Sequence, residues 1–270
     1  MHKKKWIVAL LVVVFATVYL VWQNNDLTVS SHEIEVDAEA LDGLHVVQLS
    51  DLHAKTFGDD QTRLVNKVIA LEPDIIVLTG DMVDSDVDSP ETHLAFLGEL
   101  SEVAPIYAVS GNHEYWSESA EEVETLYESL GVTSLEDACI PFSDTAYPVT
   151  LCGIRDYMTF SGFTDYEDSL PDPSQNRFNI LLAHRPVYFE SYAERDYDLV
   201  LSGHAHGGMI RLPFLGGLYG PDQGWFPSYT TGPYKESGTT MIVSRGLGNS
   251  VFPFRIQTRP EIIAIELKSR

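Results

Sequence analysis

Short apolar runs alternate with helix-like patterns through the first half of the chain. Three compact apolar runs predict buried strands at residues 44–49, 75–79 and 106–109. Apolar residues that recur at helical spacing predict helices at residues 61–71, 94–100 and 117–130. Strands that alternate with helices in this way usually pair in parallel through right-handed crossovers. The first half is therefore predicted to have an α/β fold.

The second half contains further apolar runs, but its middle is harder to interpret. Strands are expected at residues 138–142, 149–154, 178–182, 199–201, 241–244 and 262–266, and an edge strand at residues 34–36. Residues 133–176 are polar and interrupted by prolines, and residues 216–234 are rich in glycine and aromatic side chains. No repeat or linker divides the chain, which favours one folded domain.

An uncharged apolar run from Trp6 to Trp22 follows three lysines near the amino terminus. At 1.5 Å per residue it would span roughly 25 Å, enough for a short membrane helix. We therefore expect a membrane anchor in residues 1–25 and a folded domain in residues 26–270. The lysines should stay cytoplasmic, which makes the protein a single-pass protein of the cell membrane with an extracytoplasmic domain. The alternative is a secreted protein after signal cleavage, but polar residues 23–26 stand where small residues would mark a cleavage site.

The charge of the chain argues against one class of partner. The formal net charge is −23, and an acidic protein repels nucleic acid and anionic lipid surfaces at long range. We therefore expect no nucleic-acid partner. Most of this charge is interpreted as solvated surface that keeps the domain soluble. The sequence does not indicate an oligomeric state.

The chain has two cysteines, Cys139 and Cys152, in adjacent apolar segments that could form a hairpin. Such a hairpin would place them opposite one another. In an oxidising compartment they would form a disulfide, whereas two buried free thiols would produce the same sequence pattern. Nothing in their surroundings indicates catalytic cysteine chemistry.

Polar side chains that can bind metal or move protons follow five of the predicted strands. These side chains are Asp51, His53, Asp81, Asn112, His113, His184, His204 and His206. They include five of the nine histidines, and the carboxyl ends of strands in such a sheet converge on one crevice. We therefore expect these side chains to form a single site.

The residue types in this set indicate metal chemistry. Imidazole, carboxylate and amide groups together suit Zn, Mn or Fe better than Ca or Cu(I). The set is too large for one ion, and one carboxylate can bridge two. Two divalent ions about 3.5–4 Å apart stabilise both the attacking and the leaving oxygen of a phosphoryl displacement. The sequence therefore predicts two divalent metal ions and hydrolysis of phosphate esters.

The order of these motifs is similar to that of a known family. The motifs are Asp51-Leu52-His53, Gly80-Asp81, Gly111-Asn112-His113-Glu114, His184 and Gly203-His204-Ala205-His206. On these residues the chain resembles the calcineurin-like metallophosphoesterases over about residues 44–266. Residues 211–213 and 244–248 resemble the membrane-associated bacterial YkuE/YaeI-like branch. The resemblance implies a four-layer αββα sandwich, preceded here by one transmembrane helix, with the metals between the two sheets.

The resemblance also implies a role for each matched position. One metal would be held by Asp51, His53, Asp81 and His206. The other would be held by Asp81, Asn112, His184 and His204, with Asp81 as the bridge. A hydroxide shared by the ions would attack phosphorus, and His113 would be catalytic, either stabilising the transition state or protonating the leaving group. Glu114 would orient His113 or pack against the following helix.

Several substrates are compatible with this resemblance. A lipid-linked or nucleotide-sugar diphosphate, like that of UDP-diacylglucosamine pyrophosphatases, suits an enzyme tethered near lipid. A phosphomonoester or phosphodiester of the cell wall or of a small molecule is the alternative. A non-catalytic metal-binding scaffold is a third hypothesis, but it predicts missing ligands or a lost His113, and the sequence shows neither.

Two arginines and one loop have more than one interpretation. Arg185 and Arg245 either bind a phosphate through their guanidinium forks or form surface ion pairs. The loop carries Leu215, Leu218, Tyr219, Trp225, Phe226 and Tyr229. These side chains either pack into the core, form an apolar wall for a substrate or touch the bilayer.

Overall fold

Two six-stranded sheets form the centre of the computed structural model, which describes residues 2–84, 89–116, 120–142, 147–156, 166, 168–250 and 252–270. The first sheet consists, in spatial order, of β1 (Thr28–Val36), β16 (Glu261–Ser269), β2 (His45–Leu49), β3 (Ile75–Thr79), β4 (Ile106–Val109) and β5 (Val132–Ser134). The second consists of β14 (Gly232–Glu236), β15 (Thr239–Val243), β9 (Leu199–Ser202), β8 (Phe178–Ala183), β7 (Val149–Ile154) and β6 (Ala138–Pro141). Strands β2 to β5 are parallel, as are β7, β8, β9 and β15. The parallel βαβ arrangement expected for the first half is confirmed.

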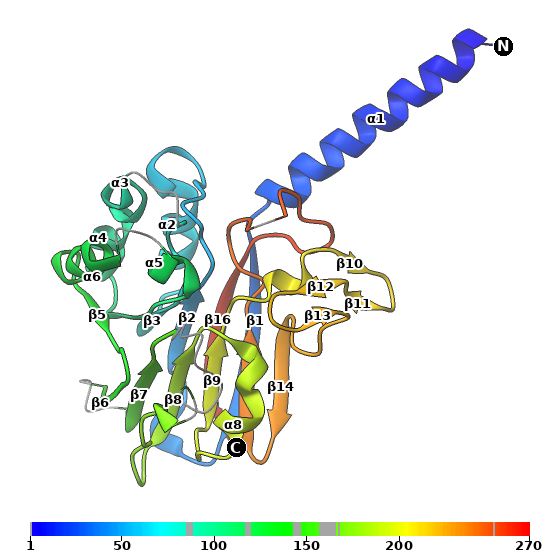
Figure 1. The fold of residues 1–270 in the computed structure, drawn as a ribbon. Helices are drawn as coiled ribbons and strands as arrows, with labels where there is room; N and C mark the ends of the chain where they lie inside the picture. Colours follow the sequence, from blue (N-terminus) through cyan, green and yellow to red (C-terminus); the bar gives the residue numbers. More distant parts are fainter. Residues whose placement is uncertain are drawn as a thin grey trace.

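Helices cover the outer faces of both sheets (Figure 1). The first sheet is covered by α2 (Thr62–Ile69), α3 (Pro90–Leu94), α4 (Phe96–Ser101) and α6 (Ala120–Ser129). The second is covered by α8 (Phe189–Ala193). Short 3-10 turns lie at Glu39–Leu41, Asp59–Gln61, Pro186–Tyr188 and His206–Gly208. The four-layer αββα sandwich is therefore confirmed.

The continuous apolar runs of the central strands follow from this layering. In β3, Ile76 and Leu78 face the helices, whereas Ile75 and Val77 pack between the sheets against residues such as Leu182. Both faces of a central parallel strand are buried, so no position alternates to a polar residue. The strand ends, where this packing stops, are the places where polar side chains gather.

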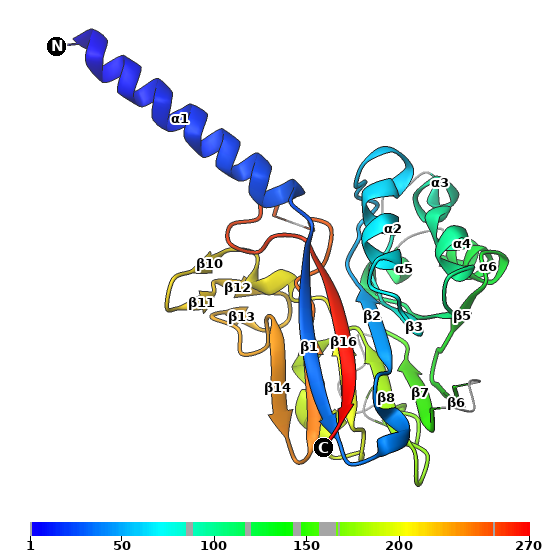
Figure 2. The same ribbon diagram turned by 180° about the vertical axis from the view of Figure 1, so that it is seen from behind.

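The amino-terminal helix α1 (His2–Asn25) projects away from the sandwich (Figures 1 and 2). Its residues Lys3–Asn25 are long and apolar enough to cross a membrane, a test that a signal sequence also passes. Only Asp26 and Leu27 separate α1 from β1. The helix therefore joins the first sheet without a flexible linker.

Several elements differ from the expected ones. The helix expected at residues 94–100 is two helices, α3 and α4, which meet at Ala95. The helix expected at residues 117–130 is described from Ala120, and residues 117–119 lie outside the described part. The short helix α5 (Asn112–Trp116) is not predicted from the sequence, because its five residues are too few to show an apolar face at helical spacing. The edge strand expected at residues 34–36 is the end of the nine-residue β1.

Cys139 and Cys152 face each other across the antiparallel pair β6 and β7 and form a disulfide. Of the two alternatives that the sequence left open, the structure has the disulfide. A cross-link with a sequence separation of 13 restricts the unfolded chain. Replacing both cysteines with alanine is therefore expected to lower the free energy of unfolding by about 3 kcal/mol. Urea unfolding of the detergent-solubilised chain measures this, and an unchanged midpoint would contradict it.

Candidate metal centre

Five strands end in one region, and each is followed by buried polar side chains. These are Asp51 and His53 after β2, Asp81 after β3, Asn112 after β4, His184 after β8, and His204 and His206 after β9. The first three strands belong to one sheet and the last two to the other. Neither sheet alone carries the full set, so the site forms where the two sheets pack together.

Asp51, His53 and His206 form the first cluster, in which one ligand atom from each residue lies within 4.8 Å of the others. The Nε2 atoms of His53 and His206 are 3.2 Å apart, and His206 Nε2 is 3.5 Å from Asp51 Oδ1. Burial lowers the pKa of both imidazoles. Two neutral imidazoles that face each other in this way have lone pairs available for a cation.

Asp81, His184 and His204 form the second cluster, within the same 4.8 Å limit. His184 Nε2 is 3.2 Å from Asp81 Oδ2 and 3.1 Å from His204 Nδ1. The same Asp81 oxygen lies 3.8 Å from His53 Nε2 of the first cluster. One carboxylate therefore faces both clusters.

Asn112 provides an independent test of whether the site fits a metal. Its side-chain oxygen is buried and has no hydrogen-bond partner in the described part of the chain. A buried amide oxygen without a partner is costly, and a bound cation would satisfy it. With the carboxylates and imidazoles beside it, this oxygen completes a donor set that suits divalent metal ions. The residues present therefore fit the metals that the sequence predicts.

The backbone of the site is strained where the candidate ligands occur. Left-handed φ angles are found at Asp51 (50°), His53 (46°), Asp81 (54°), His204 (63°) and His206 (47°). Such angles cost on the order of 1–3 kcal/mol for residues other than glycine, and they cluster at functional sites. The strained loops turn the side chains back toward the gap between the sheets.

Gly80 allows the loop after β3 to approach the centre. Its φ is +85°, and an added Cβ would lie 2.6 Å from Gly111 N and 2.6 Å from His184 Nδ1. Any larger residue would push His184 away from Asp81. Glycine at this position is therefore required by space as well as by backbone angle.

Burial and neighbouring charges set the protonation of the second cluster. Burial opposes ionisation of Asp81, but His184 and His53 hold the pKa of its carboxyl well below the usual value. Burial also opposes protonation of His184, but Asp81 raises the pKa of this imidazole to about 10. A metal that binds His184 must displace this proton, so metal binding should strengthen as the pH rises.

Two histidines of the second cluster are oriented by partners of the ring nitrogen that faces away from the cluster. The Nδ1–H of His184 donates to the carbonyl of Thr79 at 2.7 Å, which leaves Nε2 facing the cluster. The Nε2 of His204 lies 2.9 Å from Asp222 Oδ2, which leaves Nδ1 facing the cluster. Burial of Asp222 is outweighed by its hydrogen bonds from His204 and Arg185, which lower the pKa of this carboxyl to about 2. The role of Asp222 could not be predicted from the sequence, because no motif marks this residue within its long loop.

Replacing Asp222 with asparagine is expected to weaken metal binding by about 10–100-fold, because His204 loses its charged partner. Titration with a competing chromophoric chelator measures this affinity. Gln223→Ala is the matched control, because Gln223 binds the backbone of Tyr229 in the same loop. Equal losses in the two variants would show that loop folding, rather than the charge of Asp222, is responsible.

Glu114 holds the loop after β3. Its carboxylate accepts hydrogen bonds from the backbone N–H groups of Asp81 (2.8 Å), Met82 (2.6 Å) and Gly111 (2.8 Å). Burial and the charge of Asp81 raise the pKa of Glu114 to about 7. This role comes in addition to the two expected for Glu114, which are orienting His113 and packing on the next helix.

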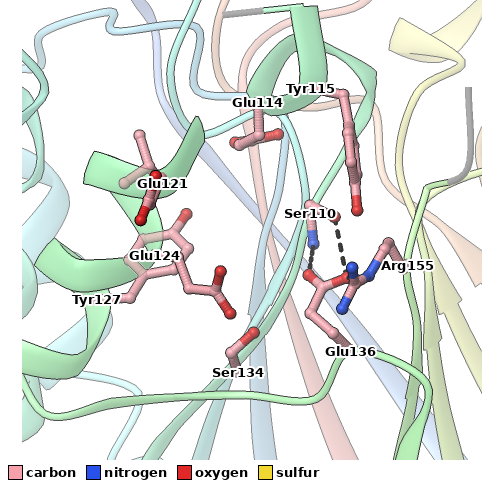
Figure 3. A pocket seen from close by; sticks show the side chains of 10 residues that line it. Ser110, Glu114, Tyr115, Glu121, Glu124, Tyr127, Ser134, Glu136 and Arg155 are labelled. Atoms are coloured by element: carbon pink, nitrogen blue, oxygen red, sulfur yellow. Dashed lines mark hydrogen bonds and ion pairs between the residues drawn. The ribbon is translucent and has the colours of Figure 1, made fainter. Parts of the chain in front are cut away.

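Glu114 also lines a cavity next to the site (Figure 3). Figure 3 shows Glu136 in this cavity, where it accepts hydrogen bonds from the backbone N–H of Ser110 and from Arg155. None of the seven expected metal-site residues is among those that line the cavity. The cavity is therefore separate from the two clusters.

His113 lies at the edge of the site, in the first turn of α5. Its Nδ1 is 2.8 Å from Asp84 Oδ1, and its ring packs edge-on against His53 with centroids 4.6 Å apart. Its backbone N–H donates to Asp81 Oδ1 at 2.8 Å. His53, Asp84 and His113 also satisfy the distance limit for a metal group. His113 therefore lies beside the first cluster, close to His53.

The two arginines form ion pairs that are largely buried. Arg185 Nε lies 2.9 Å from Asp156 Oδ2, and its Nη1 contacts Asp222, the partner of His204. Arg245 pairs with Glu261, whose side chain is buried. The ion-pair interpretation is therefore correct for both residues, but these pairs are not surface pairs. Arg185 supports the site through Asp222.

Comparison with known proteins identifies the family. The family described as "Calcineurin-like phosphoesterase" matches residues 44–208. The chain is 32% identical over 235 residues to the uncharacterized metallophosphoesterase YkuE of Bacillus subtilis, covering 84% of this chain and 80% of that protein. It is also 32% identical over 249 residues to a transmembrane protein with a metallophosphoesterase domain from Danio rerio, covering 87% of this chain and 55% of that protein.

A solved structure has a similar arrangement at low sequence identity. It is a dimetal phosphatase from Danio rerio, with a TM-score of 0.46 and 12% identity, covering 76% of this chain and 88% of that one. The family match spans more than half of the chain and includes every strand end that carries a candidate ligand. The chain belongs to the calcineurin-like metallophosphoesterase family and is a metal-dependent hydrolase of phosphate esters.

Proposed function

We propose that the chain binds two divalent metal ions, Mn, Zn or Fe, and hydrolyses phosphate ester or pyrophosphate bonds with them. The ligands would be Asp51, His53 and His206 for one ion and Asn112, His184 and His204 for the other. Asp81 would bind both, and its position between the two clusters is the observation that carries the proposal. When bound, such ions activate water as a nucleophile and stabilise charge on the phosphoryl oxygens.

In this proposal His113 acts on the substrate rather than on a metal. Asp84 holds its Nδ1, and the ring lies at the rim of the site beside His53. A protonated imidazole there would donate a proton to the leaving oxygen or offset negative charge in the transition state. Asp84 would be a positioning residue, because its carboxylate lies 2.8 Å from His113 Nδ1 and so orients the ring.

The proposed location is the outer face of a membrane, with α1 as an uncleaved anchor. Three lysines precede the apolar segment, and the disulfide between Cys139 and Cys152 is typical of oxidising compartments. A carboxyl-terminal reporter that is active only outside the cytoplasm is expected to score positive. A cytoplasmic result would contradict this topology. Fractionation then separates an anchor from a cleaved signal, because only the uncleaved chain stays with the bilayer and keeps residues 1–25.

The proposed substrate is a phosphorylated small molecule or a lipid-linked phosphate. A lipid-linked or nucleotide-sugar diphosphate is favoured by α1, which would hold the site near lipid. A cell-wall or small-molecule phosphomonoester or phosphodiester is the second candidate. A screen of both classes with the purified full-length chain in detergent would decide between them.

The central test combines metal analysis with turnover. The purified chain should contain two divalent ions per molecule and hydrolyse a chromogenic phosphomonoester or phosphodiester, and chelation followed by metal addition should abolish and restore the activity. Two bound ions without turnover of any phosphate ester would favour a non-catalytic scaffold. A single bound ion would contradict the assignment of Asp81 as a bridge.

A further inference from the structure

Large apolar side chains are exposed mainly in two neighbouring segments, which we call the apical loops: residues 212–226 and residues 252–254. Residues 212–226 include the hairpins β10 (Arg211–Leu212) with β11 (Gly216–Gly217), and β12 (Tyr219–Gly220) with β13 (Gly224–Trp225). Outside α1, eight of the twelve exposed large hydrophobic residues in the described part lie in these loops. They are Leu212, Phe214, Leu215, Tyr219, Trp225, Phe226, Phe252 and Phe254.

These side chains are strongly exposed. Phe214 is 107% exposed and Trp225 is 68% exposed, relative to the reference value for each residue type. The loop thus does not pack into the core at these positions, although Tyr229 of the same stretch packs edge-on against Phe189. An apolar patch of this kind on an otherwise acidic chain indicates a binding surface.

Residues that flank the apical loops are attached to the end of α1. The side-chain oxygen of Asn24 accepts hydrogen bonds from Arg255 N at 3.0 Å and from Asn249 Nδ2 at 3.2 Å. Arg211 N donates to Ile256 O at 2.9 Å, which joins the hairpins to the same segment. Figures 1 and 2 both show the hairpins at the end of the domain from which α1 leaves, on the side toward which α1 rises. A bilayer crossed by α1 would therefore face the apical loops.

Cationic side chains lie beside this junction. Arg63 donates to the backbone oxygen of Asn25 at 3.3 Å, and the Arg259 guanidinium lies 5.0 Å from the centre of the Trp22 ring. The chain as a whole is strongly acidic, so Arg63 reduces repulsion where the domain comes nearest to lipid phosphates, whereas the charge of Arg259 is offset by its ion pair with Asp26. Tryptophan and tyrosine, both present in the apical loops, favour the boundary between lipid and water.

A small pocket connects the apical loops to the metal centre. It is lined by His206 of the first cluster, by Met209, and by Phe252 and Phe254 of the apical loops. The surface and the site are therefore neighbours, and the position of one determines the position of the other.

We propose that the apical loops insert into the interfacial layer of a phospholipid bilayer and form a second membrane contact in addition to α1. The proposal rests on the proposed membrane anchoring by α1. One helix would fix only the distance of the domain from the membrane, whereas a second contact also fixes its tilt. The metal centre would then face the lipid surface, and its substrates would be phosphate groups carried at that surface.

The test uses the full-length chain in nanodiscs of phosphatidylcholine and phosphatidylglycerol, with one spin label per molecule. Both native cysteines form the disulfide, so a thiol introduced by Phe214→Cys can be labelled selectively. Glu236→Cys is the matched control, at the exposed end of β14 next to the turn that leads to β15. The label at position 214 should be several-fold less accessible to an aqueous relaxation agent than the label at 236, and more accessible to oxygen dissolved in lipid. Equal aqueous accessibility at both positions would overturn the proposal.

A second variant connects the contact to catalysis. Trp225→Ser combined with Phe226→Ser should raise the aqueous accessibility of the label at 214 and lower hydrolysis of a phosphate ester embedded in vesicles. Hydrolysis of a soluble chromogenic ester should not change. If this variant hydrolyses the embedded ester at an unchanged rate, the loops do not help to present substrate. This conclusion holds whatever the accessibility of the label at position 214.

Insertion of the label at position 214 into the bilayer can be measured in an inactive enzyme. The membrane contact and the proposed phosphoesterase function can therefore be tested separately. A chain that carries Asp81→Asn should still show an immersed label at position 214. An unsubstituted chain with an immersed label that hydrolyses no phosphate ester would count against the proposed function alone. An exposed label in an active enzyme would count against the membrane contact alone, and a chain that does not enter nanodiscs would overturn the anchoring on which this proposal rests.

Discussion

Asp81→Asn is expected to remove the metals and the activity together. Asp81 Oδ2 is 3.2 Å from His184 Nε2 and 3.8 Å from His53 Nε2, so one negative charge serves both clusters. Asparagine keeps the shape of the side chain but loses this charge, which weakens binding at both positions at once. Metal stabilisation of the transition state amounts to several kcal/mol, so turnover should fall by at least about a thousandfold. Elemental analysis and steady-state kinetics on one preparation measure both effects.

The control for Asp81→Asn is Asp74→Asn. Asp74 lies just before β3, at its opposite end, where its carboxylate accepts a hydrogen bond from His45 N at 2.8 Å. This variant removes one negative charge at the end of β3 that lies away from the site, so the metal content of the chain should stay normal. Full metal content in Asp81→Asn would show that Asp81 does not bridge the ions.

His113→Ala is expected to leave both metals bound while turnover falls by about 10²–10⁴-fold, the usual range for loss of a general acid. The loss should be largest for substrates with poor leaving groups and should shrink for nitrophenyl esters, whose leaving group needs no proton. An equal loss for good and poor leaving groups would limit His113 to charge stabilisation. Metal content therefore has to be measured alongside the rates.

Two outcomes around His113 distinguish the roles that the geometry allows. His53, Asp84 and His113 lie close enough together to hold an ion, so a His113→Ala chain that loses metal would make His113 a ligand. Asp84→Asn should reproduce part of the kinetic loss, because Asp84 Oδ1 lies 2.8 Å from His113 Nδ1. Full activity in Asp84→Asn would show that this contact does not position His113 for the reaction.

The central strands and the strand-end clusters could be predicted because the same physical feature produces both. In β2, Val46 packs between the sheets and Val47 packs under the helices, so both faces of the strand take apolar side chains. The run ends with the strand at Leu49, and Asp51 follows. The end of an apolar run therefore marks the edge of the sheet, and polar residues there are candidates for a site.

The residues behind the site could not be predicted, because their contacts depend on how long loops fold. Asp222 reaches His204 from a Gly-rich loop 18 residues later in the chain. Glu114 was visible as part of a motif, but its bonds to the backbone of Asp81 and Met82 depend on how α5 packs on the loop after β3. The strand β1 is mostly polar and forms because β16 pairs with it along all nine residues.

The order in which the chain is synthesised gives the pairing of β1 with β16 a further consequence. β1 directly follows α1 and is made early, but its only neighbour in the sheet is β16, with Thr28 paired to Glu261 and Val36 to Ser269. β16 in turn lies between β1 and β2. The first sheet therefore cannot close until residues 261–269 have been synthesised, and a chain interrupted before residue 261 would leave β1 and β2 each with an open edge.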